Sequence, residues 1–251
     1  MKLIKTCALF LLLFIMFMIP ARANECASNW YIKKNGRNTP IFPDDSDFLD
    51  CHNGYYVGKG EDCKKKIFLT FDAGYENGNI EKILDVLKEE NVPAAFFILK
   101  NLIYKNTDLV KRMAEEGHLV CNHTKNHKDM TTLTAEEMKA NLKFLEDLYN
   151  EYTGKEMAKY FRFPEGRYNC NTILTAEEAG YKTVFWSLAY ADWDDTNQPS
   201  EEKAIKILTD NIHDGAIVLL HPTSRTNARI LKTMIKTWRD MGYSFGTLDE
   251  L

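Results

Sequence analysis

Ionisable side chains follow short apolar runs at five widely separated places in this sequence. They are two carboxylates, two imidazoles and a guanidinium, at Asp72, Asp192, His123, His221 and Arg162. Four of them lie at or just past the end of an apolar run that predicts a β-strand, and Asp192 comes a few residues after one. Hydrolysis of an amide needs a base, an acid and a group that stabilises the charged intermediate. The pattern therefore predicts a hydrolytic site.

His123 and His127 stand four positions apart. On one helical turn or in one tight loop, this spacing lets both imidazoles face a common point, as two ligands of a metal ion must. The pattern carries little weight by itself, but here it directly follows an apolar run that ends at Cys121 and Asn122. We therefore expect a cation site with two imidazole ligands, which hold a metal less firmly than three ligands do.

From residue 65 onward, short apolar runs alternate with amphipathic segments, as in consecutive βα units. The apolar runs predict seven strands, at 67–71, 94–99, 119–121, 160–163, 183–187, 216–220 and 244–246. The amphipathic segments predict helices at 79–90, 107–116, 134–151, 172–179, 201–212 and 227–241. Seven parallel strands are one fewer than in a closed barrel, so we expect an α/β fold with an incomplete (β/α)7-type barrel. Its strand ends would bring the five groups to one face, although a doubly wound open sheet fits the same pattern.

The net charge and the N-terminal residues restrict the possible functions further. The net charge of −4 argues against a nucleic-acid binder, which needs a basic surface, and is compatible with a glycan ligand. Residues 1–23 have two lysines, an apolar run at 8–19 and the sequence Ala21-Arg22-Ala23, which together are typical of a secretory signal peptide. The run is shorter than the roughly 20 residues of a membrane-spanning helix, so cleavage is favoured over an uncleaved anchor.

Residues 24–64 are rich in Asn, Asp, Gly, Lys and Pro and show no periodicity. They predict an irregular N-terminal arm, and residues 65–251 predict one domain. Cys51 and Cys63 flank a glycine-rich part of the arm. An exported protein permits a disulfide between them without requiring one, so their pairing stays open.

Five motifs together resemble the polysaccharide deacetylase (NodB-like) family, over a stretch from about Lys65 to Leu251. They are Thr70-Phe71-Asp72-Ala73-Gly74, His123-Thr124-Lys125-Asn126-His127, Arg162-Phe163-Pro164-Glu165-Gly166, Asp192-Trp193 and Leu219-Leu220-His221. The family's fold is a distorted, incomplete barrel of the kind expected above. The resemblance implies a metal-dependent hydrolase that removes acetyl groups from amino sugars.

The resemblance also implies a role for each motif. Asp72 would be the general base, and Arg162 would orient it. His221 would be the general acid, with Asp192 as its partner. The backbone N–H of Glu165 would stabilise the oxyanion. The cation would be held by His123 and His127, with Zn²⁺ the first choice and Mn²⁺, Co²⁺ or Mg²⁺ the alternatives.

One position departs from the family pattern. Ala73 stands where most members have an aspartate that binds the metal. Its methyl group cannot coordinate a cation, so the resemblance implies a weakly held metal here. A branch of the family also departs from the paired aspartates at this position, so the departure does not by itself imply an inactive protein.

That branch comprises the enzymes that form muramic δ-lactam in spore cortex, and the segments 71–78, 184–193 and 224–228 resemble it. The resemblance implies a secreted, monomeric enzyme of the cell envelope, acting on peptidoglycan strands in the space between forespore and mother cell. Its substrate would be N-acetylmuramic acid without peptide. Glu165 stands where the branch commonly has an arginine, so Arg167 or Arg225 is expected to bind the lactyl carboxylate. Trp193 and Tyr75 are expected to contact sugar.

Three other functions stay open at this point. The chain could deacetylate chitooligosaccharides or another glycan. It could be a glycosidase with a carboxylate pair, Asp72 with Glu76 or Asp192, although that chemistry needs no histidine pair. It could also be a non-catalytic glycan-binding protein, which would explain Ala73. Release of acetate without cleavage of the glycan chain separates the deacetylases from the last two.

Overall fold

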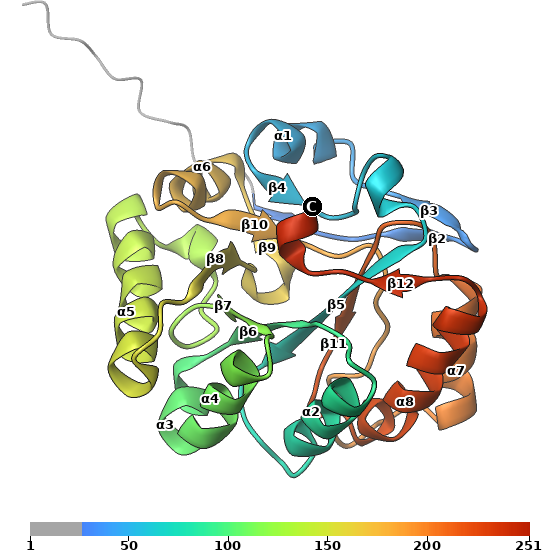
Figure 1. Ribbon diagram of the computed structural model, residues 1–251. Helices are drawn as coiled ribbons and strands as arrows, with labels where there is room; N and C mark the ends of the chain where they lie inside the picture. Colours follow the sequence, from blue (N-terminus) through green and yellow to red (C-terminus); the bar gives the residue numbers. More distant parts are fainter. Residues whose placement is uncertain (1–26) are drawn as a thin grey trace, which may run out of the picture.

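The computed structural model describes residues 27–251, and Figure 1 shows a curled sheet surrounded by helices. The expected signal peptide at 1–23 lies outside the described residues, as does Cys26. Within residues 27–251, no helix combines the length and the hydropathy that a bilayer span requires.

A parallel sheet forms the centre of the fold, with the strand order β11-β5-β6-β7-β8-β10-β4. These strands are β4 (Gly54–Tyr55), β5 (Lys66–Ala73), β6 (Ala95–Ile98), β7 (Leu119–Asn122), β8 (Ala158–Phe161), β10 (Lys182–Val184) and β11 (Ala216–Leu220). A further strand, β12 (Ser244–Phe245), pairs with the start of β5. Residues 67–71 and all of β6 and β11 are buried, because both faces of a parallel sheet are covered. The predicted incomplete barrel is confirmed.

Irregular segments that follow β10 and β4 contact β11 and complete the wall between the two edges of the sheet. The backbone N–H groups of Ser187 and Leu188 both donate to the carbonyl of Ile217, at 2.9 and 3.2 Å. At the other end of β11, the N–H of Gly58 donates to the carbonyl of Gly215 at 2.7 Å. The barrel wall therefore continues through hydrogen bonds that belong to no strand pair.

Helices cover the outside of the sheet (Figure 1). They are α2 (Ile80–Glu89), α3 (Lys100–Lys105), α4 (Thr107–Glu115), α5 (Ala135–Thr153), α6 (Cys170–Glu178), α7 (Glu201–Asp210) and α8 (Arg225–Asp240). The expected capping box is present at α5, where Thr134 Oγ1 accepts from Glu137 N at 3.2 Å and Glu137 Oε2 accepts from Thr134 N at 2.9 Å. The short α3 was not predicted, because its six residues are too few for a periodic signal.

The N-terminal arm contains more structure than its composition indicated. It has β1 (Ser28–Asn29), β2 (Lys33–Asn35), β3 (Asn38–Ile41) and α1 (Ser46–Cys51), and it contributes β4 to the sheet. β1 pairs with β9 (Arg167–Tyr168). The buried Trp30 donates from Nε1 to the carbonyl of Trp186 at 2.9 Å and stacks on Phe185. Cys51 and Cys63 are free thiols, so the disulfide that the sequence left open is not formed.

The contact between the arm and the barrel gives a testable prediction. Gly215 has φ +70, and a Cβ built there would lie 2.1 Å from the carbonyl oxygen of Gly58. Gly117 has a similar φ, +84, with nothing within 4 Å of such a Cβ. We expect Gly117→Ala to cost about 1 kcal/mol of unfolding free energy from its φ alone. Gly215→Ala should cost about 2 kcal/mol more, because the backbone must also move.

Urea unfolding of the two variants and the unmodified protein measures this difference. Equal losses for the two alanine variants would show that the close approach of the arm to β11 contributes nothing to stability.

Candidate active site

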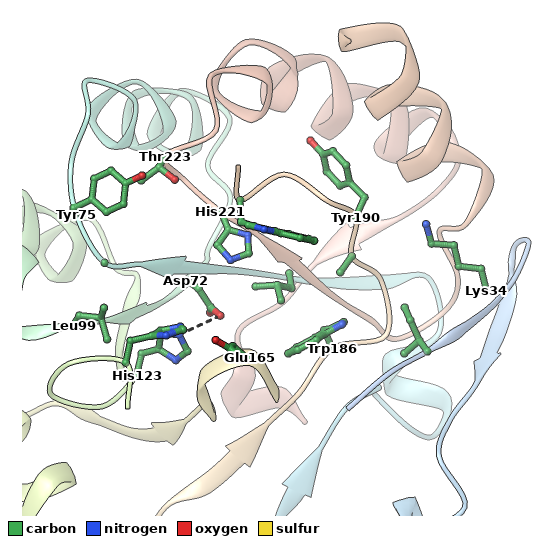
Figure 2. Close-up of a pocket in the computed structure, with 16 residues that line it drawn as sticks. Lys34, Asp72, Tyr75, Leu99, His123, Glu165, Trp186, Tyr190, His221 and Thr223 are labelled. Atoms are coloured by element: carbon green, nitrogen blue, oxygen red, sulfur yellow. Dashed lines mark ion pairs between the residues drawn. The ribbon is translucent and has the colours of Figure 1, made fainter. Parts of the chain in front are cut away.

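A cavity of about 850 Å³ opens at the carboxyl ends of the barrel strands (Figure 2). Asp72, His123 and His221 are turned toward one another in it. Apolar walls surround this polar centre. The lining of the cavity also includes Ile32, Lys34, Tyr75, Leu99, His127, Glu165, Trp186, Tyr190, Trp193 and Leu219.

Arg162 follows β8 and is fully buried. Its Nη1 donates to Asp72 Oδ1 at 2.8 Å, its Nη2 donates to Thr70 Oγ1 at 2.9 Å, and its Nε donates to the carbonyl of Val184 at 2.9 Å. Burial by itself would raise the pKa of Asp72, but the charge of Arg162, helped by His123 and His221, lowers it below the ordinary value. Asp72 is therefore ionised at neutral pH and can accept a proton.

His123 lies directly after β7 and is buried. Its Nδ1 is 2.8 Å from the carbonyl oxygen of Arg162. Because a carbonyl only accepts hydrogen bonds, Nδ1 must carry the proton, which leaves a lone pair on Nε2. That Nε2 lies 3.5 Å from Asp72 Oδ2. Burial lowers the pKa of His123 to about 4, so the ring is neutral, as a metal ligand must be.

The turn from His123 to His127 brings the two rings side by side. Their centroids lie 5.0 Å apart. Thr124 and His127 both have positive φ, at 74 and 58, and the N–H of His127 donates to Thr124 Oγ1 at 2.9 Å. Such backbone strain in residues other than glycine often marks a functional site. The strained turn presents two imidazoles to the cavity.

The imidazole nitrogens of His123 and His127 are suitable ligands for a divalent cation, but they are fewer than the three protein ligands of a usual site. Ala73 is fully buried in the apolar core and offers no ligand atom. Over residues 27–251, no cluster of three or more His, Cys, Asp or Glu side chains is arranged to hold a metal ion. His123 and His127 would hold a cation, with Asp72 as the carboxylate beside them.

His221 follows β11 and pairs with the buried Asp192. Its Nδ1 lies 2.7 Å from Asp192 Oδ1, and its backbone N–H donates to Asp192 Oδ2 at 2.8 Å. Burial by itself would lower the pKa of His221, but the hydrogen bond and the charge of Asp192 raise it above the ordinary value. Since Nδ1 is engaged with Asp192, Nε2 is the nitrogen that can donate a proton in the cavity.

Asn227 completes this pair and was not predicted from the sequence. Its Nδ2 donates to Asp192 Oδ2 at 2.6 Å and to the carbonyl of His221 at 3.0 Å. Ser224 caps α8 by accepting from the N–H of Asn227 at 3.1 Å. A helix cap that directly follows the histidine motif was the available signal, since it places the first turn of α8 beside His221.

Glu165 lines the cavity from the turn after Arg162, with φ 57. Arg167 and Arg225, which were expected to bind the lactyl carboxylate, do not line the cavity. Arg167 lies outside it, with Nε 2.8 Å from Asp129 Oδ2. Arg225 is the exposed first residue of α8.

Two exposed aromatic side chains stand in the cavity wall. Trp193 is 63% exposed and lies edge-on to His221, with ring centroids 6.5 Å apart. Tyr75 is 48% exposed and donates to Asp195 Oδ2 at 2.6 Å. Ile32 and Lys34, from the arm, also line the cavity and were not expected to.

Comparisons with known proteins agree with this geometry. Residues 59–184 match the family model described as polysaccharide deacetylase. The chain belongs to the polysaccharide deacetylase family. It is 36% identical to peptidoglycan-N-acetylmuramic acid deacetylase PdaA of Bacillus subtilis, over 89% of this chain and 85% of the relative.

Solved structures of the family superpose closely. The structure of PdaA, a family 4 carbohydrate esterase, has a TM-score of 0.86 and covers 91% of this chain and 97% of its own. A family 4 carbohydrate esterase from Bacillus anthracis has a TM-score of 0.75 at 38% identity, covering 91% and 96%. A pseudoenzyme of the same family from that organism has a TM-score of 0.72 at 27% identity, covering 79% and 68%.

The opposite pKa shifts of Asp72 and His221 predict a broad pH optimum for deacetylase activity. Activity should fall at low pH only below the ordinary aspartate range, because the pKa of Asp72 is lowered. It should fall at high pH only above the ordinary histidine value, because the pKa of His221 is raised. In Asp192→Asn, the high-pH fall in kcat/KM should move to lower pH, because the charge and the hydrogen bond that raise the pKa of His221 are lost.

Asp194→Asn is the matched control, because Asp194 is exposed on the same loop and its carboxylate accepts hydrogen bonds from the N–H and Oγ1 of Thr196. Its pH profile should superimpose on that of the unmodified protein. An unshifted profile for Asp192→Asn would exclude His221 as the group that titrates at high pH.

Ala73 generates a second prediction for this site. We expect weak Zn²⁺ binding by the unmodified protein and binding at least about 10-fold tighter by Ala73→Asp, because a third protein ligand is added. An unpaired aspartate in this apolar surrounding is destabilising. Zn²⁺ should therefore raise the Tm of the variant more than that of the unmodified chain.

Calorimetry and thermal unfolding measure both effects, and Ala73→Asp/His127→Ala should lose them. Tight, stoichiometric binding by the unmodified protein would show that another residue completes the site.

Proposed function

We propose that this protein removes acetyl groups from N-acetylmuramic acid in peptidoglycan. The family is one of hydrolases, and the named activity of PdaA supports the choice of substrate. The observation that carries the proposal is that Asp72, bonded to Arg162, and His221, bonded to Asp192, face one cavity; these contacts lower the pKa of Asp72 and raise that of His221. A base and an acid separated in this way at neutral pH suit the hydrolysis of an amide.

In the proposed reaction, Asp72 takes a proton from a water molecule while the oxygen of that water forms a bond to the carbonyl carbon of the acetyl group. Arg162 holds the carboxylate of Asp72 in place for this transfer. The backbone N–H of Glu165 stabilises the oxygen that becomes negative. A divalent cation bound by His123 and His127 would polarise the carbonyl and the water.

Collapse of the tetrahedral intermediate breaks the bond between carbon and nitrogen. His221 Nε2 gives its proton to the departing nitrogen, and Asp192 compensates the positive charge of the imidazole through the 2.7 Å contact at Nδ1. The products are acetate and the free amino sugar. On muramic acid, the amine then lies close to the lactyl carboxyl of the same sugar, which favours closure to the δ-lactam.

The substrate and its location follow from the same proposal. Trp193 and Tyr75 present aromatic faces for sugar rings. Arg167 and Arg225 are the candidates from the sequence for the lactyl carboxylate. The enzyme would act as a secreted monomer in the cell envelope, on strands from which the peptide has been removed during spore formation.

The alternative favoured by a specific observation is a glycan-binding protein without activity. Ala73 removes a cation ligand, and the family includes a pseudoenzyme. Against it stands the polar centre: hydrogen bonds hold Asp72, Arg162, Asp192 and His221 in an arrangement that glycan binding alone does not need.

Acetate release tests the proposal directly. We expect a glycan with peptide-free N-acetylmuramic acid to be deacetylated about 10-fold to 150-fold better than an oligomer of N-acetylglucosamine, because its carboxylate can form a charge-assisted contact. Asp72→Asn should lower the rate about 100-fold to 10,000-fold. Its Tm should fall as well, because asparagine keeps the shape of the side chain but leaves the buried charge of Arg162 without its carboxylate, so rates are compared well below the Tm of the variant.

Mass analysis of the treated glycan distinguishes the outcomes. Loss of acetyl from an intact chain supports a deacetylase, whereas shortened chains would identify a glycosidase. Bound but unaltered glycan would identify a binding protein. A preference for the N-acetylglucosamine oligomer would refute the muramic acid assignment.

A further inference from the structure

Lys34 is a cation in the wall of the active-site cavity, supplied by the N-terminal arm. It lies on β2 and belongs to the cavity lining together with Ile32. In Figure 2, Lys34 stands on the far side of Trp186 from Asp72, with its ammonium turned inward. The cavity of about 850 Å³ has room for more than one sugar ring, so Lys34 can contact a bound glycan away from the reacting amide.

Among residues 27–251, no acidic side chain forms an ion pair with Lys34. Although much of the side chain is exposed, partial burial of the ammonium lowers the pKa of Lys34. Two other charged groups at or near the cavity have partners. Asp72 is paired with Arg162, and Arg167, outside the lining, is paired with Asp129. Glu165 is a second carboxylate in the lining; like Lys34 it makes no ion pair among residues 27–251, and in Figure 2 it lies near Asp72, away from Lys34. An ammonium at a partly desolvated wall is stabilised when a carboxylate comes beside it.

The backbone that carries Lys34 is held against the barrel. β2 pairs with β3, and Ile32 packs on the apolar cluster that contains Trp30 and Phe185. Trp30 N and Nε1 donate to the carbonyls of Gly166 and Trp186, at 2.8 and 2.9 Å. The turn that carries Glu165 and the strand that carries Lys34 are therefore connected through Trp30. This connection fixes the place of Lys34 relative to the reacting groups.

We propose that Lys34 binds a carboxylate carried by the glycan, and so determines the preference of this site for an anionic amino sugar. This inference rests on the deacetylase function proposed above. The carboxylate comes either from the lactyl group of the reacting muramic acid or from that of another muramic acid along the strand. Lys34 acts through binding, so its contribution belongs mainly to KM rather than to kcat.

The test compares Lys34→Gln with Lys33→Gln on two substrates, peptide-free glycan with muramic acid and an oligomer of N-acetylglucosamine. Lys33 is adjacent on β2, exposed and outside the cavity lining, because successive side chains of a strand point in opposite directions. We expect Lys34→Gln to lower the ratio of the two kcat/KM values about 3-fold to 20-fold, mainly through KM. Lys33→Gln should leave the ratio unchanged, and Lys34→Arg should keep most of it.

Glycan length separates the two sources of the carboxylate. If the reacting sugar supplies it, the effect of Lys34→Gln should be complete on a disaccharide with a single muramic acid. If another sugar supplies it, the effect should appear only on strands with two or more. Calorimetry in the Asp72→Asn background should show the same loss of affinity without turnover.

The outcomes also separate this inference from the proposed function. If the unmodified protein releases acetate and prefers the muramic glycan, but Lys34→Gln keeps the full preference, the role of Lys34 is refuted and the function stands. If the unmodified protein has no preference for the muramic glycan, the proposed substrate fails. Equal effects of Lys34→Gln and Lys33→Gln would indicate general surface charge and would also refute the inference.

Discussion

The buried guanidinium of Arg162 connects the parts of the molecule on which the site depends. Four of its five N–H groups donate, to Asp72, Thr70, Val184 and Phe185, and its Cζ lies 4.1 Å from the centroid of the Phe97 ring. Thr70, which accepts from Arg162, also donates from its hydroxyl to the carbonyl of Val218 at 2.8 Å and so links Arg162 to β11. A buried cation is tolerated only when it is paired and hydrogen-bonded in this way. The same contacts join β5, the end of β10 and β11, across the gap that no strand pair closes.

Arg162 also sets the protonation of two other groups. Its side chain keeps Asp72 ionised, and its carbonyl accepts from His123 Nδ1, which leaves Nε2 free of a proton. His221 depends instead on Asp192 and Asn227, at a separate position in the barrel. The cavity thus holds the neutral imidazole of His123 and the imidazole of His221, whose pKa is raised, on either side of the Asp72 carboxylate. Two independent hydrogen-bond networks allow these histidines to differ in charge at the same pH.

The sequence predicted the parts of the structure that depend on local patterns. Buried parallel strands such as β5 and β11 are continuous apolar runs, so the barrel and the groups at its strand ends could be recognised. The arm could not, because β1, β2 and β4 have two or three residues each and show no period. Lys34 was missed for this reason. The pairing of Arg167 with Asp129 joins residues 38 positions apart, which no local pattern specifies.

The extent of the family match separates what is shared from what is particular to this chain. Residues 59–184 contain Asp72, His123, His127, Arg162 and Glu165, so the proposed general base and the proposed cation ligands lie inside the match. Asp192 and His221 follow it, and Lys34 precedes it. Among residues 27–251, Lys34 is the only Lys or Arg in the cavity lining, and it belongs to the arm, which carries none of the groups in the proposed reaction. A segment that packs through Trp30 but carries no reacting group can change its contacts with substrate without disturbing the Arg162 network. Differences in substrate among proteins with this barrel are then expected to lie in such flanking segments.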